Sequence, residues 1–261
     1  MPGINVTLMS NTDTTDFGFE NVPSLEKSRR VSNVFSSVAN NYDLMNDLMS
    51  FGIHRLWKRI AVHYAAVKPG HCILDLATGT GDMALLYHER VGENGRIYAS
   101  DVNRDMLLLG RNKMVDHGII QGIHYLQANA ECIPFQDNCF DRVSIAFGLR
   151  NVTDKDKALK SMFDKIKYGG CLIILEFSQL VLPGIKKLYD AYSLNVIPWI
   201  GKTVAKDENS YRYLVESIRR HPNQDTLMKM LQQAGFGKVE YFNLTGGIVA
   251  IHRAYKIRIF P

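Results

Sequence analysis

The chain has 261 residues, of which 46% are hydrophobic and 22% are charged, and its net charge is +5. This composition is typical of a folded globular protein and argues against a disordered chain. Lys and Arg are scattered, with small groups at 186–187, 219–220 and 253–258. Because nucleic-acid surfaces usually concentrate these residues on one face, we expect no nucleic-acid partner.

The four cysteines form no CxxC pair and have no His at zinc spacing, so we expect no metal site. No apolar run approaches the ~18 residues of a membrane-spanning helix. The first twenty residues lack the basic-then-apolar pattern of a signal peptide. We therefore expect a cytoplasmic protein, which is compatible with binding at a membrane surface.

The N-terminal part divides into a polar arm and a helical segment. Residues 1–24 are rich in Thr, Asn, Asp and Ser, and we expect a flexible arm there, followed by one domain over 25–261. Within 25–66, apolar residues recur at spacings of three and four, as at Val31 and Val34, which predicts helices with one buried face. Breaks at 40–42 and 50–52 divide this segment into three helices.

Strand and helix patterns alternate after residue 70. The expected strands cover residues 72–77, 95–100, 122–127, 140–147 and 170–177. The expected helices cover residues 82–91, 104–117 and 154–167. This alternation predicts an α/β fold whose parallel strands are joined by right-handed crossovers.

A helical insertion over 183–221 interrupts the alternation, and it includes a helix at about 210–219. A helix at 223–234 and strands near 237–243 and 247–255 follow. The insertion and the helices of 25–66 both fall where they can cover the carboxyl edge of the sheet. We predict that they form a lid.

Residues 73–82 (ILDLATGTGD) are an apolar run that ends in a glycine-rich turn. A second apolar run ends on Asp101. Strand, glycine turn, helix, strand and acid is the arrangement with which α/β proteins bind a nucleotide-like cofactor at the carboxyl edge of a sheet. The Asp101 carboxylate can accept hydrogen bonds from both ribose hydroxyls, in NAD and in S-adenosylmethionine proteins alike.

Charge helps to choose between these cofactors. Gly79 and Gly81 begin a match to G-x-G-x-x-G/A, which permits a dinucleotide, whose pyrophosphate would sit at the helix N-terminus. Asp82 in the first helical turn and Asp75 in the preceding strand would repel a pyrophosphate. S-adenosylmethionine, with its ammonium and sulfonium groups, is the better match. Asp82 can also serve as an N-terminal helix cap.

A polar loop at 127–131 follows the third strand and should lie beside the adenine ring. Asn129 offers that ring both a donor and an acceptor. Asn is also a common turn residue that needs no ligand.

Four longer motifs resemble those of the ubiquinone/menaquinone-biosynthesis C-methyltransferases of the UbiE type. They are NYDLMNDLMSFGIHRLWK at 41–58, FGLRNVTDKDKA at 147–158, NSYRYLVESIR at 209–219 and NLTGGIVAIHR at 243–253. The resemblance covers residues 17 to 256. It implies the class I methyltransferase fold, a Rossmann-like sheet of seven mostly parallel strands with the last strand antiparallel.

The resemblance also implies a reaction and a cofactor site. The reaction is methyl transfer from S-adenosylmethionine to a ring carbon of a polyprenylated benzoquinol, a demethylmenaquinol, or both. The implied cofactor residues are Thr80 in the glycine turn, Asp101 at the ribose, and Asn129 with Ala130 at the adenine. At the end of the fourth strand, where a Ser is expected, this chain has Ala146.

Methylation of a ring carbon requires a protein that orients the ring, stabilises phenolate-like charge and accepts a proton. Arg150 stays protonated, so it suits stabilisation of a phenolate oxygen better than proton abstraction. Asn151 would orient the ring oxygens. Tyr42 and His54 are candidate lid groups, and the pKa of His54 suits proton transfer. Alternative roles are a core aromatic for Tyr42, a core histidine for His54 and an exposed ion pair with Asp154 for Arg150.

The polyprenyl tail of such a substrate needs apolar walls. Met45, Met49 and the aliphatic segment 185–200 can supply them, although ordinary helix packing explains the same residues. The substrate also suggests contact with a membrane surface, with other quinone-biosynthesis enzymes or with a second copy of the chain.

Three other functions stay open at this point. An NAD(P)-dependent oxidoreductase would bind nicotinamide cofactors and ignore S-adenosylmethionine. A methyltransferase acting on RNA or protein would carry a basic surface and usually an added binding domain. A non-catalytic scaffold of quinone synthesis would tolerate loss of Arg150.

Overall fold

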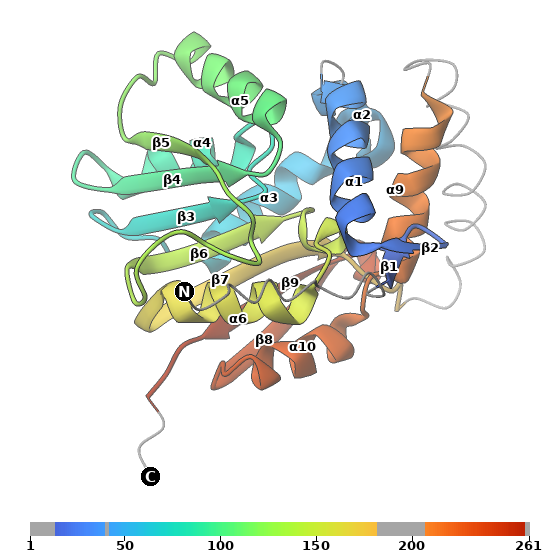
Figure 1. Ribbon diagram of the computed structural model, residues 1–261. Helices are drawn as coiled ribbons and strands as arrows, with labels where there is room; N and C mark the ends of the chain where they lie inside the picture. The colour runs from blue at the N-terminus through green and yellow to red at the C-terminus, as the bar shows by residue number, and fades with distance from the viewer. Residues whose placement is uncertain (1–13, 40–41, 182–206, 259–261) are drawn as a thin grey trace, which may run out of the picture.

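A computed structural model describes residues 14–39, 42–181 and 207–258 of the chain (Figure 1). Its centre is a seven-stranded sheet with the strand order β5-β4-β3-β6-β7-β9-β8. The strands are β3 (Cys72–Leu76), β4 (Arg96–Asp101), β5 (Ile123–Gln127), β6 (Phe140–Ala146), β7 (Ile166–Phe177), β8 (Lys238–Leu244) and β9 (Val249–Tyr255). Within this sheet β9 runs antiparallel to β7 and β8, and the other pairs of neighbouring strands are parallel. The expected class I methyltransferase sheet, with its last strand antiparallel, is confirmed.

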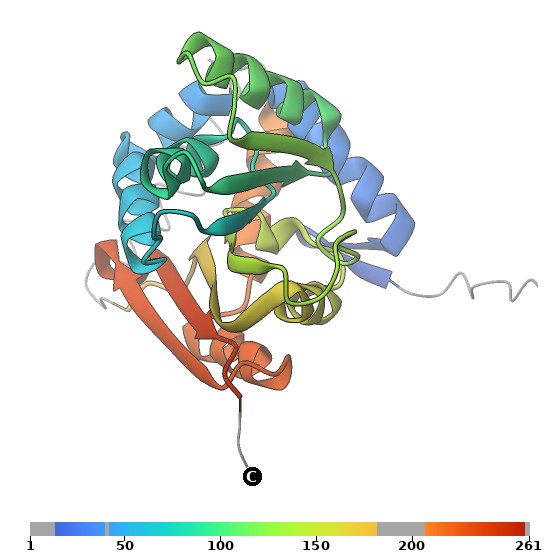
Figure 2. The same cartoon turned by 90° about the vertical axis from the view of Figure 1, so that its left-hand side faces the viewer.

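Helices cover both faces of the sheet. They are α3 (Ile53–Tyr64), α4 (Asp82–Val91), α5 (Arg104–Asp116), α6 (Lys155–Lys165) and α10 (Gln224–Gln233). Figure 2, seen from the amino ends of the parallel strands, shows α3 and α4 on one face and α6 and α10 on the other. Both faces are therefore buried, which explains why the strands read as continuous apolar runs.

The alternation of side chains along a strand divides the core into two clusters. In β3, Ile73 packs with α3 and α4, whereas Leu74 and Leu76 pack with α6 and α10. Successive residues of a strand point to opposite faces, so each cluster takes every second side chain. Burial on both faces fixes the register of β3 between β4 and β6, and with it the position of the glycine turn that follows.

Two N-terminal helices and α9 lie across the carboxyl edge of the sheet. They are α1 (Ser24–Val38), α2 (Tyr42–Ser50) and α9 (Glu208–Arg220). The strand arrows in Figure 1 point toward them. The Ser37 hydroxyl of α1 donates to Asp207 at the start of α9, over 2.7 Å. This position is compatible with the predicted lid, whose movement stays a prediction.

The third N-terminal helix does not share this position. In α3, Trp57, Ala61 and Val62 belong to the core cluster that also contains α4. The helix packs against α4 and β7. Thus α3 is part of the cover of the sheet, although the sequence pattern placed all of 25–66 in the lid.

A hairpin that the sequence did not predict precedes α1. Its strands are β1 (Thr14–Phe17) and β2 (Glu20–Pro23), in antiparallel pairing. The Phe17 ring stacks on that of Tyr213 in α9, with centroids 4.3 Å apart. The fully buried Lys27 donates to the Val152 carbonyl over 3.2 Å and pairs with Asp16 over 3.4 Å. The second half of the expected flexible arm is therefore regular structure, and residues 1–13 lie outside the described residues.

Other expected elements lie partly outside the described ranges. Of the insertion expected at 183–221, only α9 and its flanking residues are described, and the apolar segment 185–200 is not. The same holds for the side chains of Met45 and Met49. Among the described helices, none has both the length and the apolar character that crossing a membrane requires.

Candidate functional site

A cavity of about 290 Å³ lies at the carboxyl ends of β3, β4 and β6. Its walls come from α1, the glycine turn, the end of β4, the loop 128–131 and the segment 147–153. We call it the large cavity. Its position outside the carboxyl ends of parallel strands is where α/β proteins bind their ligands.

The glycine turn is shaped by backbone that only glycine adopts easily. Gly79 and Gly81 have φ angles of 56° and 84°, in the left-handed region. A Cβ on Gly110 of α5 would lie 3.0 Å from the Gly79 carbonyl oxygen, so α5 approaches the turn closely. Gly79 lines the large cavity, whereas Gly81 does not and serves as the N-cap of α4.

Asp101 ties this turn to the end of β4. Its carboxylate accepts the backbone N–H of Gly79 over 3.0 Å and that of Asn103 over 2.9 Å. Burial raises the pKa of Asp101, and these backbone hydrogen bonds lower it by a smaller amount. Each carboxylate oxygen keeps further acceptor capacity. Asp101 lines the large cavity, so this geometry fits a ligand with vicinal hydroxyls.

The loop after β5 contributes both predicted residues, Asn129 and Ala130, to the same cavity. The side-chain oxygen of Asn129 accepts the N–H of Glu131 over 2.9 Å, which leaves its amide N–H groups to donate. Glu131, which was not among the predicted site residues, also lines the cavity. One of its oxygens accepts the N–H groups of Thr153 and Asp154.

The large cavity is acidic. Asp101 and Glu131 line it, and no Lys or Arg does so among the described residues. An anionic pyrophosphate would meet two carboxylates there without a cation, whereas a sulfonium would be attracted. Asn129 can donate hydrogen bonds and Asp101 can accept them from hydroxyls, so the residues present fit S-adenosylmethionine.

Asp82 contributes less to this preference than the sequence suggested. It pairs with Lys58 over 2.7 Å and with Lys113 over 2.6 Å. Burial raises its pKa, but the two ammonium groups outweigh burial and hold the pKa well below its usual range. Its charge is compensated, so its expected repulsion of a pyrophosphate was wrong. The alternative role as a cap was also wrong, because Gly81 is the N-cap of α4 and no side chain caps it.

A smaller cavity of about 20 Å³ lies beside the glycine turn, and we call it the turn cavity. Asp75 and Thr80 both line it. The Asp75 carboxylate accepts the hydroxyls of Thr78 over 2.6 Å and Ser144 over 2.7 Å, and burial raises its pKa to about 6. The Thr80 hydroxyl donates to Asp43 of α2 over 2.8 Å.

A third cavity, also of about 20 Å³, lies between α1, α9 and the segment 149–151, and we call it the arginine cavity. Arg150 lines it and pairs with Glu176 at the end of β7, over 2.8 Å. Its guanidinium also donates to the Phe147 carbonyl. The expected ion pair with Asp154 is wrong, because Asp154 caps α6 instead. Sequence spacing gave no signal for Glu176, which lies 26 positions from Arg150.

Asn151 lines both the large cavity and the arginine cavity. The Tyr213 hydroxyl of α9 donates to its side-chain oxygen over 3.0 Å. Burial raises the pKa of Tyr213, so this hydroxyl keeps its proton. The amide N–H groups of Asn151 are then left as donors at the junction of the two cavities.

The structure separates the two candidate lid groups. Tyr42 lines all three cavities. His54 is buried, hydrogen-bonds to Asp47 over 2.8 Å and lines none of the three. Burial lowers the pKa of His54, and the positive charge of Lys58 lowers it further. The structure therefore brings Tyr42, Arg150 and Asn151 together and leaves His54 in the packing between α2 and α3.

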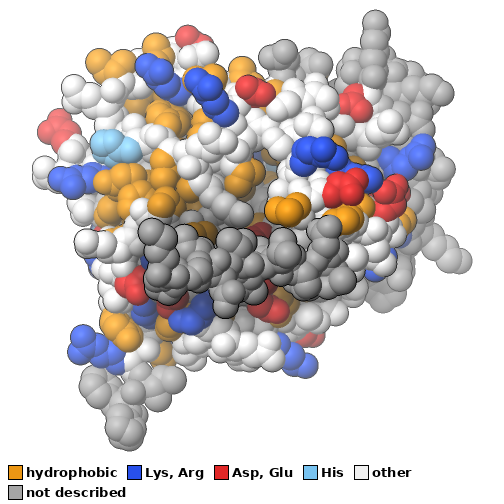
Figure 3. Space-filling view, in the orientation of Figure 1, with side chains coloured by type: hydrophobic (Ala, Val, Ile, Leu, Met, Phe, Trp, Pro, Cys, Tyr) orange, Lys and Arg blue, Asp and Glu red, His pale blue; other side chains and the backbone are white. Residues whose placement is uncertain are grey.

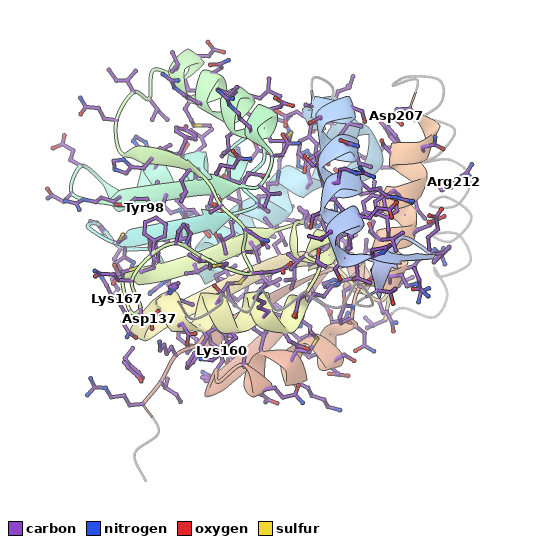
Figure 4. The ribbon with its side chains drawn as sticks, viewed as in Figure 1. Tyr98, Asp137, Lys160, Lys167, Asp207 and Arg212 are labelled. Atoms are coloured by element: carbon purple, nitrogen blue, oxygen red, sulfur yellow. The ribbon has the colours of Figure 1, made fainter. Side chains whose placement is uncertain are left out.

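The opposite end of the sheet carries surface ion pairs. Figure 4 shows Asp137 and Lys167 at this end, far from Asp207 at the start of α9. Lys167 pairs with Asp141 over 2.9 Å at the partly exposed surface, where such pairs contribute little stability. On the face seen in Figure 3, Lys and Arg are spread among other side chains. Within the described ranges, no cluster of three or more His, Cys, Asp or Glu is suited to hold a metal.

Comparison with known proteins identifies the family to which the chain belongs. The model of the ubiE/COQ5 methyltransferase family matches residues 24–256. The ubiquinone/menaquinone biosynthesis C-methyltransferase UbiE of Serratia proteamaculans (strain 568) is 57% identical over 244 residues, which cover 94% of this chain and 97% of that protein. The protein of the same name from Escherichia coli O1:K1 / APEC is 55% identical with the same coverage.

Solved structures resemble the chain in fold. A SAM-dependent methyltransferase from Aquifex aeolicus has a TM-score of 0.59 and 18% identity, over 82% of this chain and 98% of that one. The [4+2]-cyclase SpnF has a TM-score of 0.64 and 13% identity, over 88% of this chain and 97% of its own. At such identities the likeness shows the fold alone.

Proposed function

Because the chain belongs to the ubiE/COQ5 methyltransferase family, we propose that it transfers a methyl group from S-adenosylmethionine to a ring carbon of a polyprenylated quinol, in ubiquinone and menaquinone biosynthesis. It is an S-adenosylmethionine-dependent C-methyltransferase. The acidic large cavity argues against the alternative of an NAD(P)-dependent oxidoreductase. Identity of 55–57% over 94% of the chain argues against an RNA or protein substrate.

One observation carries the assignment of roles: the acidic cavity at the glycine turn continues to Asn151, beside the buried Arg150. We assign Asp101 to the ribose hydroxyls, and Asn129 with Ala130 to the adenine. When bound, the cofactor supplies an electrophilic methyl group. The protein then has to present the quinol ring to that group, and correct orientation alone is worth roughly 7–11 kcal/mol in favourable systems.

Asn151 and Arg150 are the candidate groups for the quinol oxygens. The side-chain oxygen of Asn151 accepts a hydrogen bond from the Tyr213 hydroxyl. The amide N–H groups of Asn151 are therefore left to donate to a quinol oxygen. Arg150 uses one nitrogen for Glu176 and Phe147, while its buried Nε has no hydrogen-bond partner among the described residues. A buried donor left without a partner costs about 1–3 kcal/mol, which a phenolate oxygen would relieve. This favours stabilisation of the quinolate by Arg150, with Tyr42 as a wall between donor and acceptor.

The chemistry of the substrate suggests where the protein works. A polyprenyl tail dissolves in a bilayer, so we propose that the chain is cytoplasmic and meets its substrate at the surface of the inner membrane. Association with other quinone-biosynthesis enzymes, or with a second copy of the chain, rests on the same argument. Co-sedimentation with phospholipid vesicles, with and without quinol, tests the membrane contact, and protein that stays in the supernatant in both cases would contradict it.

The first prediction concerns the natural substrate. Deletion of the gene should cause a quinone precursor to accumulate that is lighter than the normal quinone by one CH2 unit, because a single methyl transfer is lost. Mass analysis of benzoquinones and naphthoquinones from the same extract shows which acceptor is used, or whether both are. An unchanged profile for both classes would contradict the proposed function. Restoration by the Arg150→Ala chain would favour the scaffold role instead.

A further inference from the structure

Lys58 is a buried cation on the side of α3 that faces the glycine turn. Lys58 is only 8% exposed, and it lines the turn cavity. Its ammonium lies 2.7 Å from one oxygen of Asp82. An ammonium has three N–H donors, and among the described residues Asp82 is its only hydrogen-bond partner. Donors are therefore left for another group.

Among the described residues, the other charged side chains that line the two cavities at the glycine turn are all carboxylates. Asp101 and Glu131 line the large cavity, and Asp75 and Asp82 line the turn cavity. Within the part of the chain that the structure describes, Lys58 is the only Lys or Arg lining either one. The cofactor has one negatively charged group, the carboxylate of its methionine portion, and a buried carboxylate without a cation is costly.

Resting on the proposed function, we propose that Lys58 binds the carboxylate of the methionine portion of S-adenosylmethionine in the turn cavity. Asp75, in the same cavity, is the partner for the ammonium of that portion. The other lysine near the turn, Lys113, pairs with Asp82 and Asp43 but lines neither cavity. This difference between two lysines that share Asp82 makes the proposal testable.

The shape of the site supports this role. The turn cavity and the large cavity share Tyr42, Ala77 and Phe147 as walls, so one ligand can extend from one to the other. At about 20 Å³ the turn cavity admits a group the size of a water molecule, so one oxygen of the carboxylate can reach Lys58 there. Lys58 also lowers the pKa of Asp75, which burial raises to about 6, so the two side chains interact electrostatically.

Two ligands that differ only in this carboxylate test the proposal. Calorimetry measures the affinity of the full-length chain for S-adenosylmethionine and for decarboxylated S-adenosylmethionine. The wild-type chain should prefer the intact cofactor, and Lys58→Met should weaken intact-cofactor binding about tenfold or more, as loss of a buried charged hydrogen bond does. Its affinity for the decarboxylated compound should fall much less, so Lys58→Met should no longer prefer the intact cofactor. Lys58→Arg, which keeps the charge, should retain the preference.

Lys113→Met is the matched control. It also removes an ion pair of 2.6 Å with Asp82, but it takes no cation from the cavity wall. Its affinity for the intact cofactor should stay within about threefold of wild type. 5′-Methylthioadenosine, which lacks the methionine portion, checks that the adenosine site is intact, and Lys58→Met should bind it like wild type.

Three results would overturn the proposal. Equal losses in Lys58→Met and Lys113→Met would assign the effect to Asp82. If Lys58→Met loses affinity equally for 5′-methylthioadenosine and for the intact cofactor, the substitution damages the whole site. A wild-type chain that binds both forms of the cofactor equally would show that no group recognises the carboxylate, even if Lys58→Met does not fold. A wild-type chain that binds neither form but binds NAD would refute the proposed function itself.

Discussion

Asn151 shows how a candidate site residue depends on a distant partner. Asn151 was predicted from its position just after the fourth strand, but its orientation comes from Tyr213, 62 positions later in the chain. Glu176 fixes Arg150 in the same way, and Lys58 enters the turn cavity from α3. Sequence patterns identify residues at the ends of strands, whereas contacts between separate elements depend on how those elements pack. For this reason Arg150 and Asn151 could be predicted from the sequence, whereas Glu176, Tyr213 and Lys58 could not.

The second prediction tests the orientation of Asn151. Tyr213→Phe removes the hydroxyl that holds the amide oxygen, so the amide can rotate and its donors lose their alignment. We expect kcat for methyl transfer to fall about tenfold, since a buried hydrogen bond is worth about 1 kcal/mol or somewhat more. The affinity for S-adenosylmethionine should not change. Tyr211→Phe, the same change at a buried position of α9 that lines none of the three cavities, is the control, and an equal loss in both variants would contradict the role.

Elements were predicted well where their pattern is long, and less well where it is short or its partner is unknown. The helix expected at 82–91 matches α4 in both bounds. The expected helix 154–167 ends early at Lys165, because β7 begins at Ile166, which pairs with Phe140. The hairpin β1–β2 was missed, since four-residue polar strands carry almost no periodic signal. The pattern of α3 gave the helix correctly but could not show which surface its apolar face covers.

The third prediction concerns α1 and α9 as a lid. Ser37→Ala removes the hydrogen bond of 2.7 Å to Asp207 while leaving Asp207 as the cap of α9. One such bond is worth about 1 kcal/mol, so the dissociation rate of bound S-adenosylhomocysteine should rise about fivefold in stopped-flow measurements. Ser217→Ala is the control, because that hydroxyl donates to Leu214 within α9 itself. If the two variants release ligand at the same rate, the contact between α1 and α9 does not control release.

The arrangement of the whole molecule followed from rules that apply to any α/β chain. Alternating strands and helices imply parallel strands and right-handed crossovers, and the site then falls at the carboxyl edge. The electrostatic preference of the site was predicted correctly in direction but partly for the wrong residue. Asp82 is compensated by two lysines, and Glu131 supplies the second carboxylate of the large cavity instead. Charges can be counted from a sequence, but their pairing needs the folded chain.

The fourth prediction links the site to the stability of the fold. Burial raises the pKa of Asp75 to about 6, above its value in an unfolded chain of about 3.9. The folded state thus binds a proton more tightly, and the free energy of unfolding falls as pH rises from about 4 to 6. Urea unfolding of the ligand-free chain should show that wild type loses on the order of 2–3 kcal/mol over this range relative to Asp75→Asn. Parallel pH curves for the two proteins would contradict a buried, titrating Asp75.

The ring of Tyr42 is a common wall of three neighbouring spaces. A ligand bound in any one of these cavities contacts the same ring, so a shift of the ring changes the volume of the other two. Binding of the methyl donor would therefore affect the space that is open to the acceptor, through the position of the Tyr42 ring.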